Sequence, residues 1–142
     1  MKAFLALSTF ITAATVVCAQ FVSIAVPSPG ATIAPGSNLL VEIDRSNTNS
    51  EVHEVATAIA LSPGGPQACL AGTTASSVLF VGPYDPQLDP GTGHKPPNQN
   101  FTVLVPESAP LGTAQLSVTR FFALGAVRGP SYEYKSITVT VG

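Results

Sequence analysis

Proline and glycine divide this sequence into short segments, and their spacing restricts the folds that the chain can adopt. The 142 residues include 13 prolines and 12 glycines, which fall between runs rich in Val, Ile, Phe, Thr and Tyr. This rhythm is typical of strands separated by turns, and no stretch shows the apolar stripe of a helix. Seven runs are predicted to be strands: 21–26, 39–45, 54–61, 77–81, 101–105, 114–122 and 132–141.

Alternation within these runs indicates half-buried strands, since successive side chains of a strand point to opposite faces. In the second run, Leu39, Val41 and Ile43 share one face, whereas Glu42 and Asp44 share the other. The last run alternates in the same way between aliphatic residues and threonines. Short strands with this pattern and spacing predict an all-β, immunoglobulin-like β-sandwich of about seven strands.

Two features depart from simple alternation. Residues 55–60 are apolar on both faces, with small residues on one, which is typical of a central strand beneath another layer. Arg120 falls in phase with Leu116 and Val118, so strict alternation would bury its charge. Because a buried ion pair must offset a large desolvation cost, we expect a β-bulge or a strand end at Arg120 instead.

The N-terminal residues 1–19 have the features of a secretory signal peptide: Lys2 gives a positive start, an apolar stretch follows, and small residues stand at the cleavage site. Residues 20–142 are then predicted to form a single secreted domain. Removing Lys2 from the six basic residues leaves five against eight acidic ones, a net charge of −3. This balance excludes a nucleic-acid partner, and no further apolar run is long enough to span a membrane.

The sequence offers no catalytic or metal-binding motif. His53 and His94 stand apart from any Gly-x-Ser-x-Gly or His-Glu-x-x-His pattern, and both are expected to be solvated turn residues. Asp85 and Asp89 are each followed by proline, which favours a turn over a calcium site. We therefore expect no enzyme activity, no metal and no cofactor.

Residues 82–100 form a connection that is much longer than the usual four to six residues. Such a loop is either a partner-contact surface or a mobile spacer. If it contacts a partner, the candidate contact residues are Tyr84, Asp85 and Asp89, together with Arg128 in the last turn.

Two further residues are candidates for covalent chemistry. Asn100, in Asn100-Phe101-Thr102, is an intact N-glycosylation acceptor where the long loop meets a strand. Cys69 is the only cysteine left after removal of the signal peptide. It is expected to be either a buried free thiol or one half of an intermolecular disulfide.

Six short segments, taken in order, carry a resemblance to a known family. They are 24–27 (Ile-Ala-Val-Pro), 33–36 (Ile-Ala-Pro-Gly), 52–61, 80–83 (Phe-Val-Gly-Pro), 121–126 (Phe-Phe-Ala-Leu-Gly-Ala) and 134–142. Their order is similar to that of the fungal necrosis-inducing secreted protein (Nis1-like) effector family, and it covers nearly all of the mature chain. Two departures bear on partner choice: Glu54 stands where the family more often has Asp, and polar residues around 89–98 lengthen a loop.

The resemblance implies a secreted fungal effector that binds a host protein. The best-known family members are understood to bind plant immune receptor kinases and to suppress defence signalling. The implied mechanism is occupancy of a partner surface, either outside host cells or after uptake into them.

A cell-wall-associated structural or glucan-binding immunoglobulin-like module is the alternative. Residues 27–30 (Pro-Ser-Pro-Gly) and 35–37 (Pro-Gly-Ser) resemble the opening of fungal wall-assembly domains. The sequence has no tryptophan for sugar stacking, so Tyr84, Tyr132 and Tyr134 would have to supply the aromatic faces, although tyrosines on strands more often pack.

Overall fold

The computed structural model describes residues 22–47, 51–65, 76–91 and 93–142. Within these ranges the chain forms eight strands and no helix, and hence no helix that could cross a membrane. The strands are β1 (Val22–Val26), β2 (Thr32–Ile33), β3 (Asn38–Arg45), β4 (Val52–Pro63), β5 (Ser77–Gly82), β6 (Asn98–Leu104), β7 (Gly112–Leu124) and β8 (Gly129–Val141). Each of the seven predicted runs is a strand. Only the two-residue β2 was not predicted.

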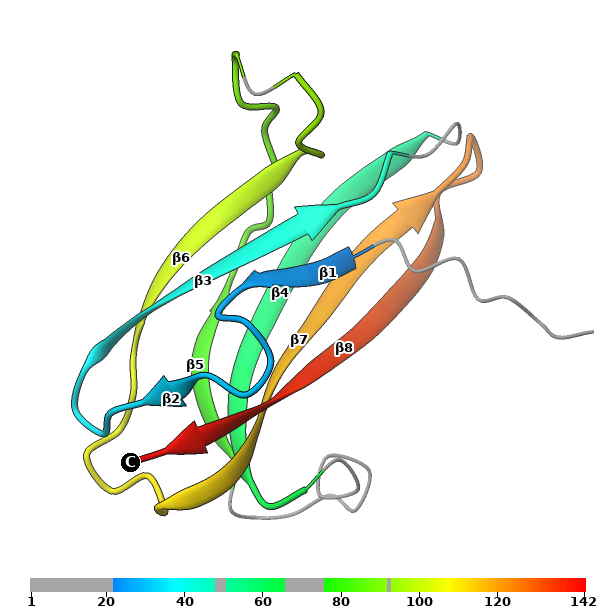
Figure 1. Ribbon diagram of the computed structural model, residues 1–142. Coiled ribbons are helices and arrows are strands. Elements are labelled where there is room, and N and C mark those ends of the chain that lie inside the picture. The colour runs from blue at the N-terminus through cyan, green and yellow to red at the C-terminus, as the bar shows by residue number, and fades with distance from the viewer. Residues whose placement is uncertain (1–21, 48–50, 66–75, 92) are drawn as a thin grey trace, which may run out of the picture.

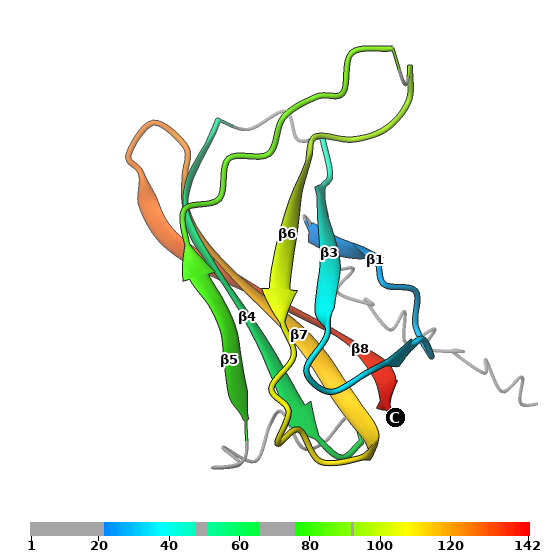
Figure 2. The same ribbon diagram turned by 90° about the vertical axis from the view of Figure 1, so that its left-hand side faces the viewer.

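The strands form two sheets that face one another (Figures 1 and 2). One sheet has three strands in the order β1-β3-β6, and the other has five in the order β2-β8-β7-β4-β5. All pairings are antiparallel except the short contact of β2 with β8, which is parallel. The predicted all-β sandwich is thus confirmed.

The core lies between the sheets and is built from the inward positions of the alternating strands. In β3, Val41 and Ile43 are fully buried, whereas Glu42 and Asp44 lie on the outer face, as predicted. The opposite sheet contributes Ile59, Leu116, Val118 and Val139, each with no exposed surface. Burial of these aliphatic side chains is the main stabilising contribution that the alternation predicts.

Strand β4 lies inside its sheet, between β7 and β5, as the apolar run 55–60 indicated. Only its inner face is covered, however. The alanines Ala56, Ala58 and Ala60 on its outer face are half-buried, and Val55 is 60% exposed. Val55 is the extra residue of a β-bulge, because the register to β7 shifts between Glu54 and Ala56. The expected covering layer is the opposite sheet, which faces the inner side of β4, and the small residues lie on the outer side.

Strands β7 and β8 form a long hairpin with uninterrupted register from Gly112 paired with Val141 to Leu124 paired with Gly129. Its turn contains Gly125 and Arg128, both with positive φ. At the same end of the sandwich, the connection from β5 to β6 projects outward (Figure 1). It spans residues 83–97 and is shorter than predicted, since β6 begins at Asn98.

Candidate functional site

The long loop does not present Tyr84 to a partner. Tyr84 is only 3% exposed, and its ring lies 6.4 Å from that of Phe101, centroid to centroid. Its hydroxyl donates to the carbonyl of Ile43 at 3.3 Å. Burial raises the pKa of Tyr84 well above its ordinary value. The prediction of Tyr84 as an exposed contact residue is wrong, because the loop leaves β5 by inserting this ring into the end of the core.

The two aspartates of the loop are exposed, but each has partners within the chain. The Oδ1 atom of Asp85 accepts from the side-chain amide of Gln87 at 2.8 Å. Asp89 Oδ2 accepts from the side-chain amide of Asn98 at 3.2 Å and lies 3.4 Å from Lys95 Nζ. These contacts shape the loop, so Asp85 and Asp89 have a structural role whether or not a partner touches them.

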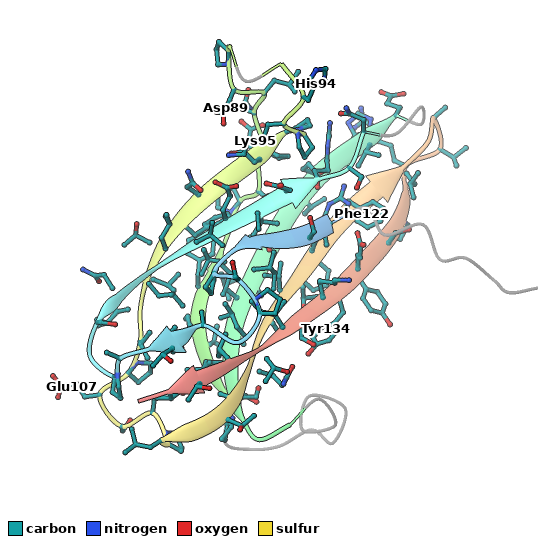
Figure 3. All side chains as sticks on the ribbon, viewed as in Figure 1. Asp89, His94, Lys95, Glu107, Phe122 and Tyr134 are labelled. Carbon is teal, nitrogen blue, oxygen red and sulfur yellow. The ribbon has the colours of Figure 1, made fainter. Side chains whose placement is uncertain are left out.

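Lys95 fastens the loop to the outer face of the three-stranded sheet. Its ammonium lies 3.0 Å from Glu42 Oε2 as well as near Asp89, and Figure 3 shows Asp89, His94 and Lys95 together on the loop. The hydrogen bond to the Glu42 carboxylate raises the pKa of Lys95. Next to Glu42, burial and then the negative charge of Glu42 raise the pKa of Asp44. This outer face is therefore charged.

A buried ionic cluster lies at the loop end of the sandwich, and sequence reasoning missed it. Arg120 is 1% exposed, in the middle of β7. Its guanidinium donates to both carboxylate oxygens of Glu54, from Nε at 2.7 Å and from Nη2, and Nη1 lies 3.4 Å from Glu133 Oε2. The guanidinium also lies 4.2 Å above the ring of Phe122. The expectation of a bulge or strand end in place of a buried ion pair at Arg120 is wrong, because two carboxylates are aligned with it; the bulge is in β4.

The same cluster connects the two sheets. Arg45 on β3 approaches Glu54 with Nη1 at 3.5 Å from Oε1, and the backbone amide of Val22 on β1 donates to Glu133 at 3.1 Å. Two arginines and two glutamates balance in charge, which lowers the cost of burying them. Because little of Glu54 and Glu133 reaches solvent, with 10% and 15% of their side chains exposed, the cluster is arranged for structure.

The outer face of the five-stranded sheet carries several exposed apolar side chains. Its exposed apolar side chains define what we call the aromatic face: Val55, Val78, Val81, Phe121, Tyr132 and Tyr134. Phe121 is 45% exposed and stands directly opposite Tyr132, which is 73% exposed. The alanines of β4 lie between these aromatic residues and β5, so the middle of the face carries only small side chains.

The remaining candidate residues lie elsewhere. Arg128 is exposed in the β7–β8 turn, with φ of 51°, and Asn100 is exposed on β6. His53 lies 3.0 Å from Glu51 at the start of β4. Cys69 is outside the described residues. In the described part of the chain, no group of three His, Cys, Asp or Glu side chains is placed to hold a metal ion.

Comparison with known proteins gives one informative match. The profile of the Nis1 family matches residues 17–140. No curated protein matches the sequence. Two solved structures, a superoxide reductase (neelaredoxin) from Ignicoccus hospitalis and a variant of it, are each 13% identical with a TM-score of 0.46, covering 84% of this chain and 80% of theirs. A likeness at this level says nothing about activity.

Proposed function

The chain belongs to the Nis1 family, and on that basis we propose that it is a secreted fungal effector that binds a host protein and so suppresses defence signalling. The first partner to test is the kinase domain of a plant immune receptor, the target that the family resemblance implies. The mechanism is occupancy of a partner surface and not the breaking of a bond.

The aromatic face is the observation that supports binding through this fold. Phe and Tyr side chains have only two rotatable χ angles, so they offer a large contact area at a small cost in conformational entropy when a partner covers them. Aromatic residues are also enriched among the side chains that dominate binding energy. The uncharged centre lets a neutral, flat patch of a partner approach without desolvating a charge.

The arrangement of ionisable groups favours binding over catalysis. Arg120, Glu54 and Glu133 are paired with one another beneath the surface, and the backbone amide of Val22 on β1 also donates to Glu133. A general acid or base must lie within hydrogen-bond distance of the reacting group. We therefore place the activity on the outer surface of the protein.

The test is a binding titration of the secreted protein against purified receptor-kinase domains. Saturable binding is expected, and the double variant Phe121→Ala, Tyr132→Ala should bind at least about tenfold more weakly. Leu111→Ala is the matched control, because Leu111 is 76% exposed but lies outside the aromatic face. Absence of saturable binding to any kinase domain would contradict the kinase assignment, and an equal loss in the control would contradict the role of the face.

A wall-associated glucan-binding module is a second candidate, and one observation favours it. Tyr132 and Tyr134 are both exposed, whereas tyrosines on strands more often pack. Together with Phe121 they offer neighbouring rings on which sugar rings can stack. Retention of the protein on insoluble glucan or chitin, combined with no kinase binding, would favour this function over the first.

A further inference from the structure

We propose that Asn100 carries an N-linked glycan and that this glycan covers the outer face of the three-stranded sheet. The proposal depends on the secretion that the proposed function requires. Asn100-Phe101-Thr102 is the only Asn-x-Ser/Thr tripeptide in the 142-residue sequence. The structure adds what the tripeptide alone does not, namely where its side chains point.

Strand alternation turns both recognised residues of the tripeptide outward. Asn100 and Thr102 are exposed on β6, whereas Phe101 between them is 6% exposed and packs its ring 4.8 Å from that of Phe80. In the described part of the chain, no hydrogen bond holds the Asn100 side chain, whereas the side-chain amide of Asn98 donates to Asp89 and to the carbonyl of Pro96. A sugar on Asn100 therefore displaces neither the core nor the loop.

The surroundings of Asn100 leave room for a bulky group. Strand β6 is at the edge of its sheet, with β3 on one side only. The loop 83–97 covers the face as far as Asn98, which is 7% exposed, and Asn100 is the next outward position along the strand. Its cross-strand neighbour is Glu42, and the next pair on the same face is Leu40 with Thr102.

Two exposed leucines give the glycan a role in the folded protein. Leu40 and Leu104 are 44% and 62% exposed on the same outer face as Asn100. Leu40 belongs to the register pair next to Asn100, so a glycan on Asn100 is close enough to shield this apolar surface from contacts with other proteins. The sandwich would then have one glycan-covered face and one open aromatic face, which directs a partner to the five-stranded sheet.

The transfer takes place in the secretory pathway with a lipid diphosphate-linked oligosaccharide as donor. The bond between the anomeric carbon of the first sugar and the diphosphate oxygen breaks. A bond from that carbon to Asn100 Nδ2 forms, the amide nitrogen loses one proton, and the lipid diphosphate leaves. No oxidant or reductant takes part.

The test uses the full chain expressed in a yeast or filamentous fungus and purified from the medium. Peptide mass spectrometry before and after treatment with an N-glycan amidase should show a glycan that is removed and leaves aspartate at position 100. Asn100→Gln and Thr102→Ala should abolish it, whereas Thr102→Ser, which keeps the acceptor, should retain it. A secreted wild-type protein with unmodified Asn100 would overturn the proposal. Failure of the chain to be secreted at all would instead contradict the proposed function.

A second measurement tests the covering of the face. Binding of a hydrophobic fluorescent dye should increase when the glycan is removed from the folded protein, and the increase should be smaller in the variant Leu40→Gln, Leu104→Gln, which introduces no new glycosylation acceptor. An unchanged dye signal after removal of the glycan would overturn the inference that the glycan covers these leucines.

Discussion

The guanidinium of Arg120 donates to both carboxylate oxygens of Glu54 across the paired strands β4 and β7. This two-point contact lies inside the sandwich, where Arg45 and Glu133 complete the charge balance. The cluster connects five strands, because its four side chains come from β3, β4, β7 and β8 and the amide of Val22 comes from β1. The integrity of this end of the fold, which carries the loop 83–97 and the β7–β8 turn, therefore depends on one ionic cluster.

Removing the Glu54 charge should destabilise the protein strongly. Glu54→Gln leaves the 1%-exposed Arg120 with a neutral main partner, and breaking a buried pair on one side costs about 3–5 kcal/mol of unfolding free energy. Urea denaturation measures this loss. The exposed Glu107 provides the matched control, since Glu107→Gln should stay within about 0.5 kcal/mol of the wild type. Equal stability of the two variants would show that the cluster is not structural.

The geometry of the Arg120 contact should matter as well as its charge. Arg120→Lys keeps the positive charge but lacks the planar fork that reaches both oxygens of Glu54. The midpoint of thermal unfolding of Arg120→Lys should therefore lie between that of the wild type and that of Arg120→Met, which lacks both the charge and the hydrogen bonds. If the lysine variant matched the wild type, charge alone would account for the cluster.

Asp44 should make the protein less stable as pH rises. Burial and the charge of Glu42 raise the folded-state pKa of Asp44 above the ordinary value of an aspartate, so the folded state disfavours the ionised form. The protonated Asp44 therefore contributes its full stabilisation at pH values below its unfolded-state pKa. This contribution to the free energy of unfolding is lost as the pH rises through the folded-state pKa. Asp44→Asn should raise the midpoint of thermal unfolding at neutral pH, and the gain should shrink as pH falls toward the acidic range. A gain that did not depend on pH would contradict titration of Asp44 as its source.

The strands were predictable from the sequence because each is covered on one face only. In β3, the alternation of Val41 and Ile43 with Glu42 and Asp44 directly indicates which face is buried. Strand β2 escaped prediction because Thr32 and Ile33 make only a two-residue parallel contact with β8, which leaves no periodic pattern. The family was also predictable, since the order of its segments is a property of the sequence.

The positions of Arg120 and Tyr84 were not predictable from alternation. Alternation shows that Arg120 points inward, but only the register of β7 with β4 and β8 brings Glu54 and Glu133 to it. For Tyr84, the path of the loop determines whether the aromatic ring enters the core or faces solvent. Loop residues have no alternating pattern from which this path could be predicted. The prediction of Tyr84 as an exposed contact residue was wrong for this reason. The aromatic face could not be predicted from the sequence, because it depends on the register of β7 with β8, which places Phe121 opposite Tyr132.

Lys95 should control the dynamics of the loop more than the stability of the core. Lys95→Met removes the contacts to Glu42 and Asp89 that hold the loop to β3. The reciprocal backbone hydrogen bonds between Gln87 and Asn98, each 2.9 Å, should then open more often. Amide hydrogen exchange at these two residues is expected to accelerate, with little change at Val118. His94→Gln, a change at the exposed neighbouring residue, is the control and should leave these exchange rates unaltered. Faster exchange at Gln87 and Asn98 in the His94→Gln variant would contradict a specific role of Lys95.

Tyr84 should act as a core residue and not as a contact residue. Tyr84→Phe removes only the hydrogen bond to the Ile43 carbonyl, which is 3.3 Å long, and should lower the unfolding free energy by about 0.5–1.5 kcal/mol. Tyr84→Ala also removes the ring beside Phe101 and should cost about 3–5 kcal/mol. Chemical denaturation measures both losses. Because the hydroxyl faces inward, Tyr84→Phe should bind any partner as tightly as the wild type, and a weaker titration with this variant would restore Tyr84 to the contact surface.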